Sequence, residues 1–182
     1  MEIEIKAKLK DKEAVMQKLT ALGCVFSEPK TQDDMVWVEK MGSLQEFLSN
    51  RVFLRIRVEG DKAILTAKKP KNIAGEGNLV KREHETIVDS AKEARAILDM
   101  LGLKEAVRTI KTRQKGMCSG YEICIDEVED LGTFIEVEKI ADEKDADRIL
   151  EEMLVFLAPL GVSAEDKVTK GYDILMLEKR GF

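Results

Sequence analysis

The chain contains few cysteine, histidine, proline and aromatic residues. Its 182 residues include three cysteines, one histidine, three prolines and 5% aromatic residues. Cys24, Cys118 and Cys124 form an odd set without the close spacing of a metal motif. We therefore expect buried or free thiols in a reducing compartment. The few aromatic residues also leave little with which to stack nucleic-acid bases.

Long apolar runs are missing as well. No stretch approaches the ~20 apolar residues that a membrane-spanning helix needs. An alternating strand pattern begins at residue 2, which leaves no room for a signal peptide. We expect a cytoplasmic protein without a membrane partner. A net charge of −5 further argues against nucleic acid and acidic membranes as partners.

Charge is what the chain has in excess. Charged residues make up 36% of it, and its 44% hydrophobic residues suffice for the core of a single domain over residues 1–182. The charge is unevenly placed, because nine basic but only three acidic residues lie between Arg51 and Arg82. A basic zone inside an acidic protein suggests a small, highly charged anion as the ligand.

The first strand combines both signs of charge. Side chains alternate between the two faces of a strand, so Glu2, Glu4 and Lys6 share one face while Ile3 and Ile5 share the other. Two carboxylates one strand repeat apart, followed by an ammonium group, can hold a divalent metal beside an anion. A solvated outer face of an edge strand is the simpler alternative.

The same alternation predicts further strands over residues 35–39, 51–59, 62–68, 79–88, 106–115, 120–126 and 133–139. Their polar faces carry the following charged residues: Arg55, Arg57, Lys68, Glu83, Glu85, Lys111, Arg113, Glu122, Asp126, Glu136 and Glu138. For one hairpin, a solvated basic face explains the pattern equally well. His84 lies out of phase with its acidic neighbours, so we expect a structural role for it.

Amphipathic helices are predicted over residues 11–22, 90–101 and 142–157, with a last short helix over 171–178. A Glu-x-Glu pair lies on the strand before each of the first three helices, and a Leu-Gly pair closes each of them. Glu2 and Glu83 are 81 residues apart, and the first two Leu-Gly pairs are 79 apart. We therefore expect two similar halves.

Two connections complete the predicted chain. Residues 40–50 are expected to have little regular structure. Residues 69–78 form a basic loop that contains Pro70, Gly75 and Gly77. A lid over an anionic ligand and a plain mobile hairpin both remain open for this loop.

If the helices cover the apolar faces, all the charged faces lie on the other side of one sheet. A sheet curled into a barrel would line its interior with them. Buried charges are costly unless they pair with one another or with a ligand. A polyphosphate with divalent metals meets this need, because arginine and lysine neutralise phosphate oxygens while carboxylates hold Mg²⁺ or Mn²⁺.

A series of motifs supports this reading along the whole chain. In order, they are Glu2-x-Glu4-x-Lys6, Arg55-x-Arg57, Lys68 in Leu65-Thr66-Ala67-Lys68, Arg82-Glu83-x-Glu85, Lys111-x-Arg113, Asp126 before Leu131-Gly132, Phe134-x-Glu136-x-Glu138, and Lys170-Gly171-Tyr172. Together they resemble the CYTH family, or triphosphate tunnel metalloenzymes. The resemblance implies an α+β fold, in which eight antiparallel strands close into a barrel with helices packed outside.

The resemblance also implies roles for the charged residues. Glu4, Glu136 and Glu138 would hold a first metal, and Glu2 with Glu4 a second metal or the attacking water, with Mg²⁺ or Mn²⁺ as two ions. The implied phosphate-binding residues are Lys6, Arg55, Arg57, Lys68, Lys111, Arg113 and Lys170. Glu2, Glu4 and Lys6 would take part in catalysis, and Glu83, Glu85 and Asp126 would be further tunnel residues.

Three functions stay open on this basis. Water as the nucleophile would make the protein a triphosphatase, while the ribose 3′-hydroxyl of ATP would make it a class IV adenylyl cyclase that releases cyclic AMP and pyrophosphate. The His-Phe dipeptide associated with bacterial cyclases of the family is absent, which favours hydrolysis. A non-catalytic module for polyphosphate or nucleotide is the third reading. The partner is a small-molecule triphosphate in each case, and a homodimer is left open.

Overall fold

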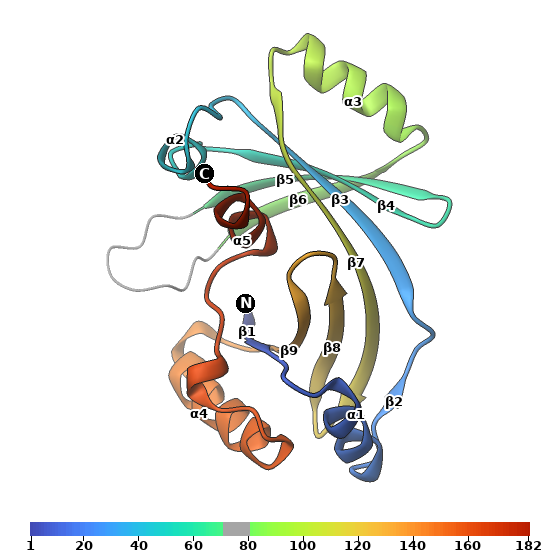
Figure 1. Cartoon of the computed structure of the whole chain (residues 1–182), viewed down its shortest axis with the longest axis vertical. Coiled ribbons are helices and arrows are strands. Elements are labelled where there is room, and N and C mark those ends of the chain that lie inside the picture. Colours follow the sequence, from blue (N-terminus) through green and yellow to red (C-terminus); the bar gives the residue numbers. More distant parts are fainter. Residues whose placement is uncertain (71–80) are drawn as a thin grey trace. The chain divides into compact units, whose positions relative to one another are not determined.

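The computed structural model describes residues 1–70 and 81–182, and it divides them into two compact units (Figure 1). Unit 1 consists of Met1–Lys30 and Thr112–Thr169. Unit 2 consists of Thr31–Lys111 and Lys170–Phe182. Each unit thus combines segments that are far apart in the chain, and each is described by itself.

Unit 1 is an antiparallel sheet with two helices. Its elements are β1 (Glu2–Lys8), α1 (Lys12–Ala21), β2 (Val25–Phe26), β8 (Tyr121–Val128), β9 (Gly132–Ile140) and α4 (Ala146–Leu157), together with the second part of β7 (Lys104–Cys118). The hydrogen-bonded order is β1-β9-β8-β7, and β2 pairs with β7 beside this path. Asp11 caps α1 by accepting a hydrogen bond from the Ala14 amide.

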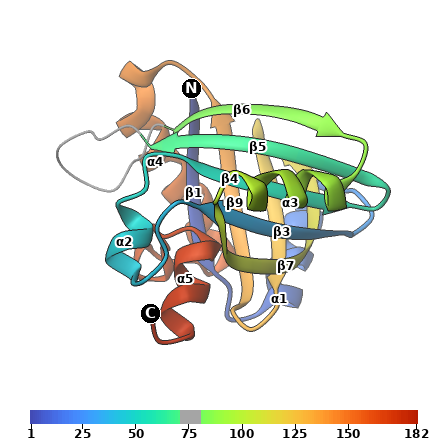
Figure 2. The same cartoon turned by 90° about the horizontal axis from the view of Figure 1, so that it is seen from above.

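Unit 2 contains the remaining elements. They are β3 (Lys30–Val38), α2 (Leu44–Leu48), β4 (Phe53–Glu59), β5 (Lys62–Pro70), β6 (Lys81–Val88), α3 (Ala91–Met100) and α5 (Tyr172–Lys179), with the first part of β7. The strand order is β7-β3-β4-β5-β6, and Figure 2 shows β3 to β6 side by side. Ser90 caps α3, as its sequence pattern predicts.

The expected α+β architecture with an antiparallel sheet is confirmed. Eight strands lie on the main hydrogen-bonded path, and β2 is a ninth, two-residue strand beside it. Over the described residues this path begins at β1 and ends at β6, so closure of the sheet is not made by its hydrogen bonds. Among the residues that the structure describes, the eight expected strands are present and β2 is an addition, because a two-residue segment is too short to show the alternation that predicts a strand.

One expected connection is partly helical. Residues 44–48 form α2, where Ser43 accepts a hydrogen bond from the Glu46 amide and the Glu46 side chain accepts one from Gly42. The expectation of little regular structure over 40–50 is wrong at this point. The cap is local, but the helix is too short to show an apolar stripe.

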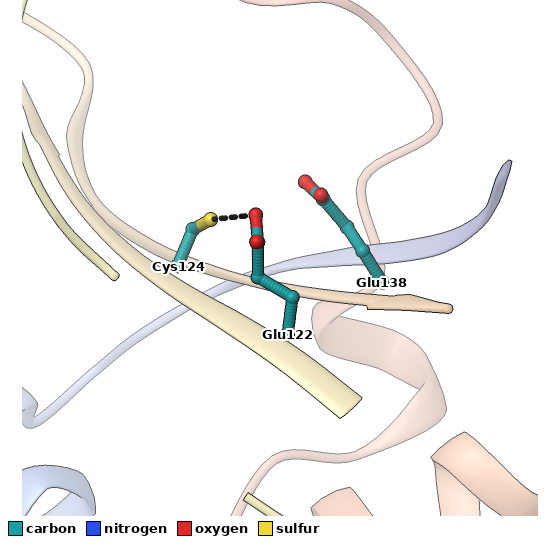
Figure 3. Close-up of side chains that lie close together, drawn as sticks. All are labelled: Glu122, Cys124 and Glu138. Atoms are coloured by element: carbon teal, nitrogen blue, oxygen red, sulfur yellow. Dashed lines mark hydrogen bonds between the residues drawn. The ribbon is translucent and has the colours of Figure 1, made fainter. Parts of the chain in front are cut away.

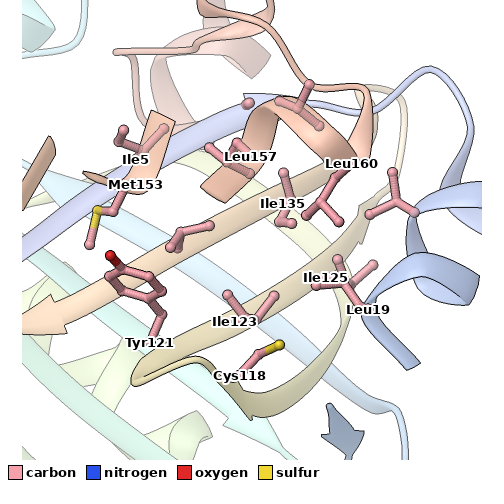
Figure 4. Packing of buried hydrophobic residues seen from close by; sticks show 14 of the residues in the cluster. Ile5, Leu19, Cys118, Tyr121, Ile123, Ile125, Ile135, Met153, Leu157 and Leu160 are labelled. Carbon is pink, nitrogen blue, oxygen red and sulfur yellow. The ribbon is translucent and has the colours of Figure 1, made fainter. Parts of the chain in front are cut away.

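The core of unit 1 lies on the apolar face of its sheet. Ile5, Ile123 and Ile135 are almost fully buried there, and Leu19 of α1 and Leu157 of α4 pack against the same cluster (Figure 4). The alternation in β1, β8 and β9 places these isoleucines on one face and the charged residues on the other.

The core of unit 2 follows the same logic. Ile56 of β4 and Trp37 of β3 pack with Ala94 and Leu98 of α3. Trp37 is 1% exposed and its indole N–H donates to Asp99, so this residue is part of the core rather than a platform for a ligand ring. The helix therefore covers the apolar face and leaves the arginine face of β4 on the other side of the sheet.

The cysteines depart from expectation. Cys24 and Cys118 form a disulfide across 94 residues, because β2 pairs with the end of β7 and sets Val25 opposite Met117. Cys124 is a buried free thiol, as expected. The pairing could not be deduced from spacing, since it depends on a strand pair between distant segments.

The Leu-Gly pairs do end their helical segments. The glycines at 23, 102 and 161 have φ values between 80° and 88°, a left-handed conformation that suits glycine at a helix end. Within residues 1–70 and 81–182, none of the helices has the length and hydropathy that crossing a bilayer requires.

Candidate functional site

The polar face of unit 1 is organised in rows across three strands. In the register of β1, β9 and β8, Glu4 lies opposite Glu138, which lies opposite Glu122. The next row on this face holds Lys6, Glu136 and Cys124. Strand pairing therefore gathers acidic residues that are more than 100 positions apart in the sequence.

Three carboxylates of this face form a candidate metal site. One oxygen from each of Glu2, Glu4 and Glu138 lies within 4.8 Å of the others. Oxygens on opposite sides of one Mg²⁺ are about 4.2 Å apart at the usual bond length. The donor set is thus hard, anionic and close to the required span, and it fits the divalent metal that the sequence motifs imply.

The electrostatics of Glu138 point the same way. Burial, together with the charges of Glu136, Glu2 and Glu4, raises the pKa of Glu138 from 4.5 to about 8. The charge of Arg113 lowers the pKa of Glu138, but burial and the three neighbouring carboxylates outweigh it. A divalent ion would supply further positive charge.

Glu136 is turned to other partners. Its carboxylate lies 3.4 Å from the Lys6 ammonium and accepts a hydrogen bond from Arg113. Lys6 also lies 3.6 Å from Glu4, so it bridges the two rows. The structure brings together Glu2, Glu4 and Glu138 of the expected metal ligands, and it places Glu136 beside this group rather than in it.

Arg113 is enclosed by acids. Its Nε donates to Asp126 at 2.6 Å, and its Nη2 donates to both Asp126 and Glu136. Burial by itself lowers the pKa of an arginine, but these two carboxylates raise that of Arg113 above its ordinary value. Arg113 thus supports Glu136, which in turn faces Lys6.

A second acidic group on this face is less suited to a hard cation. Glu122, Cys124 and Glu138 lie close together, with the Cys124 thiol donating to Glu122 (Figure 3). Burial raises the pKa of the Cys124 thiol, and a protonated thiol is a poor ligand. Lys115 already pairs with Glu122 at 2.6 Å and lowers its pKa.

The polar face of unit 2 is basic and centred on β4. Arg57 donates from Nε and Nη2 to the two carboxylate oxygens of Asp34 at 2.6 and 2.7 Å. Arg55 lies on the same face, and its Nη2 donates to the Thr66 hydroxyl at 3.3 Å. Its Nε is buried and has no hydrogen-bond partner among residues 1–70 and 81–182.

The other basic residues of unit 2 have their own contacts. Lys68 pairs with Glu83 at 2.7 Å, and Arg55 lies 4.0 Å from Glu85. The Lys111 ammonium is 5.0 Å above the Tyr172 ring of α5, and Lys111 is 5% exposed.

Two further expectations concern the ends of this unit. The Lys170 ammonium donates to the Glu178 carboxylate at 2.6 Å. This contact joins the residues just before α5 to the last turn of the same helix. The basic loop expected over 69–78, for which the sequence leaves open both a lid and a mobile hairpin, lies outside the described residues from residue 71 onwards.

Asp34 is the residue that sequence reasoning missed. The predicted strand began at residue 35, whereas β3 begins at Lys30 and carries Gln32 and Asp34 on alternate positions. The alternation of Gln32, Asp34 and Val36 was the signal for a longer strand. It was hidden because Asp33 and Asp34 together read as a polar connection.

The sequence matches the model of the CYTH domain over residues 1–172, which is nearly the whole chain. The chain belongs to the CYTH family. Proteins of this family are metal-dependent triphosphatases or adenylyl cyclases.

Relatives agree with this assignment. A protein of Methanocaldococcus jannaschii, named as a proposed adenylate cyclase, is 35% identical over 182 residues, which is 100% of this chain and 99% of the relative. A solved structure from Pyrococcus horikoshii OT3 is similar with a TM-score of 0.78 and 26% identity, over 99% of this chain and 100% of that one.

A plant protein shares the fold at lower identity. It is a proposed adenylyl cyclase from Hippeastrum, whose structure is described as revealing a dominant triphosphatase activity. The TM-score is 0.60 at 22% identity, over 100% of this chain and 96% of that one. These likenesses support the CYTH fold.

Proposed function

We propose that the chain is a metal-dependent triphosphatase. In the proposed reaction, a water oxygen attacks the terminal phosphorus of a triphosphate, the bond from this phosphorus to the bridging oxygen breaks, and orthophosphate and a diphosphate leave. Inorganic triphosphate, a nucleoside triphosphate and thiamine triphosphate all present the required group.

The carboxylate group of Glu2, Glu4 and Glu138 carries this proposal. Three acids within 4.8 Å of one another, one with its pKa raised to about 8, would repel a bare phosphate. They make chemical sense when a divalent cation lies among them. A module that only binds anions would not need this arrangement.

The residues of unit 1 would prepare the reacting groups. Glu2 and Glu4 are exposed and would orient the attacking water, while Glu138 would fix the metal. Lys6, which already bridges Glu4 and Glu136, would take the charge of a phosphate oxygen. We assign Arg113 to holding Glu136 in place, since Asp126 and Glu136 accept the hydrogen bonds of its Nε and Nη2.

The residues of unit 2 would take the charge of the substrate. Arg55, Lys68 and Lys111 would neutralise phosphate oxygens, with Lys170 joining them after release from Glu178. Arg57, whose Nε and Nη2 already donate to Asp34, would add its positive charge beside them. A divalent metal, Mg²⁺ or Mn²⁺, would polarise a phosphate oxygen and stabilise the developing negative charge. Positioning and charge neutralisation would then supply most of the rate acceleration.

A class IV adenylyl cyclase is the second candidate. The relative from Methanocaldococcus jannaschii favours it, because that protein is named as a proposed adenylate cyclase and matches over the full chain. The same metal and cation set would then promote attack of the ribose 3′-hydroxyl on the α-phosphorus of ATP, releasing pyrophosphate. The missing His-Phe dipeptide is our reason for placing this second.

Product analysis tests both candidates. Purified protein is incubated separately with inorganic triphosphate, ATP and thiamine triphosphate, each with Mg²⁺ and with Mn²⁺. We expect orthophosphate and no cyclic AMP. Cyclic AMP with an equal amount of pyrophosphate would establish the cyclase instead, and binding of triphosphate without turnover would support a binding module.

Substitutions connect the activity to the carboxylate group. Glu138→Gln should lower kcat by about a thousandfold, as loss of a metal ligand does in similar sites. Glu122 lies opposite Glu138 on β8, so Glu122→Gln serves as the matched control. We expect this variant to lower kcat by less than about tenfold. Equal losses in the two variants would contradict the assignment of the metal to Glu2, Glu4 and Glu138.

A further inference from the structure

We propose that Asp34 is a positioning residue that holds Arg57 in a fixed orientation and thereby leaves Arg55 as the arginine open to an anion. The inference rests on the proposed function for its catalytic consequence. The geometry of the clamp is a property of unit 2 by itself.

The clamp joins two neighbouring strands. Asp34 on β3 lies directly opposite Arg57 on β4 in the antiparallel register. Two parallel N–H···O bonds of 2.6 and 2.7 Å connect the planar guanidinium to the planar carboxylate. This two-bond geometry fixes orientation as well as distance, which a single ion pair does not. The side chains of Asp34 and Arg57 are 13% and 16% exposed, so water competes little for the pair.

The two arginines differ in what remains for a ligand. Asp34 takes the Nε and one Nη group of Arg57, which are the edge that a phosphate would otherwise grip. In the part of the chain that the structure describes, the buried Nε of Arg55 has no hydrogen-bond partner. The contacts of Arg55 to Asp34 and Glu85 are at 4.0 Å, beyond hydrogen-bond length. A buried donor without a partner is costly, and an anion would satisfy it.

The charges of the cluster are consistent with this division. Burial and the neighbouring charge of Arg57 lower the pKa of Arg55, which marks it as a cation short of negative charge. Burial would raise the pKa of Asp34, but Arg57, Arg55 and Lys111 together lower it. Asp34 thus interacts with three residues to which the sequence motifs assign phosphate binding, and it limits their mutual repulsion before a substrate arrives.

A matched control lies one residue away. Asp33 forms the same two-bond pair with Arg108, at 2.8 and 2.7 Å. Successive side chains of a strand lie on opposite faces, so this second pair is on the other face of the sheet. Asp33→Asn therefore removes an equivalent ion pair without touching Arg55 or Arg57.

Steady-state kinetics with inorganic triphosphate separate positioning from structure. Asp34→Asn frees Arg57 and removes a negative charge, so we expect KM to fall about threefold while kcat falls at least about tenfold. Asp34→Glu, which restores a carboxylate, should recover kcat to within about threefold of the parent. Asp33→Asn should change neither constant by more than about twofold. A loss of folded protein cannot lower KM. A fall in KM together with kcat therefore distinguishes a positioning role of Asp34 from a purely structural one.

A second pair of variants keeps the test valid if Asp34→Asn does not fold. Lysine retains the charge of arginine but cannot form the two-bond contact. Arg55→Lys should raise KM by about tenfold or more, because it removes the donor left open for the anion. Arg57→Lys should raise KM by less than about threefold and act mainly on kcat. The reverse order of the two KM effects would overturn the proposal.

Nuclear magnetic resonance tests the clamp without catalysis. In ligand-free protein labelled with ¹⁵N, the Arg57 Nε–H should exchange slowly with water, and Asp34→Asn should abolish that protection. Titration with inorganic tripolyphosphate should move the Arg55 Nε–H signal before that of Arg57. Fast exchange at Arg57 in the parent protein would refute the clamp. A protected Arg57 in a protein that neither binds nor cleaves triphosphates would instead refute the proposed function and leave the clamp standing.

Discussion

At the scale of residues, the carboxylates of the site differ in whether a lysine or arginine forms an ion pair with them. Arg113 forms ion pairs with Asp126 and Glu136. Lys6 forms an ion pair with Glu136, and Lys115 forms one with Glu122. Glu138 instead lies among Glu136, Glu2 and Glu4, and its pKa is raised to about 8. The arrangement of these neighbours, rather than the number of acids, is our reason for proposing a metal at Glu138.

Glu138 should make the metal-free protein less stable as pH rises. Its pKa is about 8 in the folded protein, against an ordinary value of 4.5. The folded protein binds the proton more tightly than the unfolded chain, so this contribution is fully present below pH 4.5 and is lost as pH rises towards about 8. A glutamine at this position cannot ionise, so the stability of Glu138→Gln should fall much less with pH than that of the parent protein. Urea unfolding with a chelator across this pH range measures it, and parallel profiles for the two proteins would contradict the assignment.

Metal binding should release a proton from the same group. Near neutral pH the Glu138 carboxyl is largely protonated in the metal-free protein, and a bound cation requires the carboxylate. Adding Mg²⁺ or Mn²⁺ to weakly buffered protein at pH 7 should therefore acidify the solution, and apparent metal affinity should rise with pH up to about 8. Calorimetry in buffers of different ionisation enthalpy counts the protons. Unchanged proton release in Glu138→Gln would show that another group is responsible.

At the scale of elements, strand pairing brings together what the chain keeps apart. The β1–β9 pair sets Glu4 opposite Glu138, and the β2–β7 pair sets Cys24 beside Cys118. The disulfide closes a long loop of the chain between Cys24 and Cys118, which contains β2 to β6 with α2 and α3. It restricts the unfolded chain far more than the folded one.

Reduction of this disulfide should cost stability. The chain-entropy estimate for a loop of this size is about 4.7 kcal/mol, and measured losses are typically about 2–5 kcal/mol. The double variant Cys24→Ser and Cys118→Ser should show a lower urea midpoint than the unreduced parent, and a reductant should bring the parent close to the variant. Cys124→Ala is the control that keeps the bridge. Alkylation of unreduced, denatured protein should label Cys124 alone, and labelling of three cysteines would contradict the bridge.

At the scale of the whole molecule, two cores share one strand. Leu157 belongs to the core of unit 1 and Leu98 to that of unit 2, while β7 contributes residues to both units. Neither unit can lose its sheet without disturbing β7. We therefore expect one cooperative unfolding transition, although each unit has its own hydrophobic cluster.

Core substitutions test that expectation. Leu157→Ala and Leu98→Ala should each cost about 2–5 kcal/mol, since both side chains are almost fully buried. Each variant should shift the whole transition, monitored by far-ultraviolet circular dichroism and by the fluorescence of Trp37 in unit 2. Ile97→Ala on the exposed side of α3 is the control, with an expected change below about 0.5 kcal/mol. Two separated transitions would show that the units unfold independently.

The sequence by itself determined most of the elements and the charged faces that they carry, although not β2, α2 or the start of β3. Alternation in β1, β4, β8 and β9 separates an apolar from a charged face, and this signal is local. Capping residues such as Asp11 and Ser90 are local as well. The motifs built on these strands sufficed to indicate the family and a triphosphate with divalent metal.

Only the tertiary structure decided which charges meet. A strand pattern says which face a carboxylate lies on, but its neighbours come from the register of strands distant in sequence. That register grouped Glu2 and Glu4 with Glu138, turned Glu136 towards Lys6 and Arg113, and joined Cys24 to Cys118. It also placed Asp34 opposite Arg57, so the partner that fixes this arginine lies on a strand that the sequence pattern began too late. Ion pairs depend on distances of a few ångströms between such residues, and composition and spacing do not contain those distances.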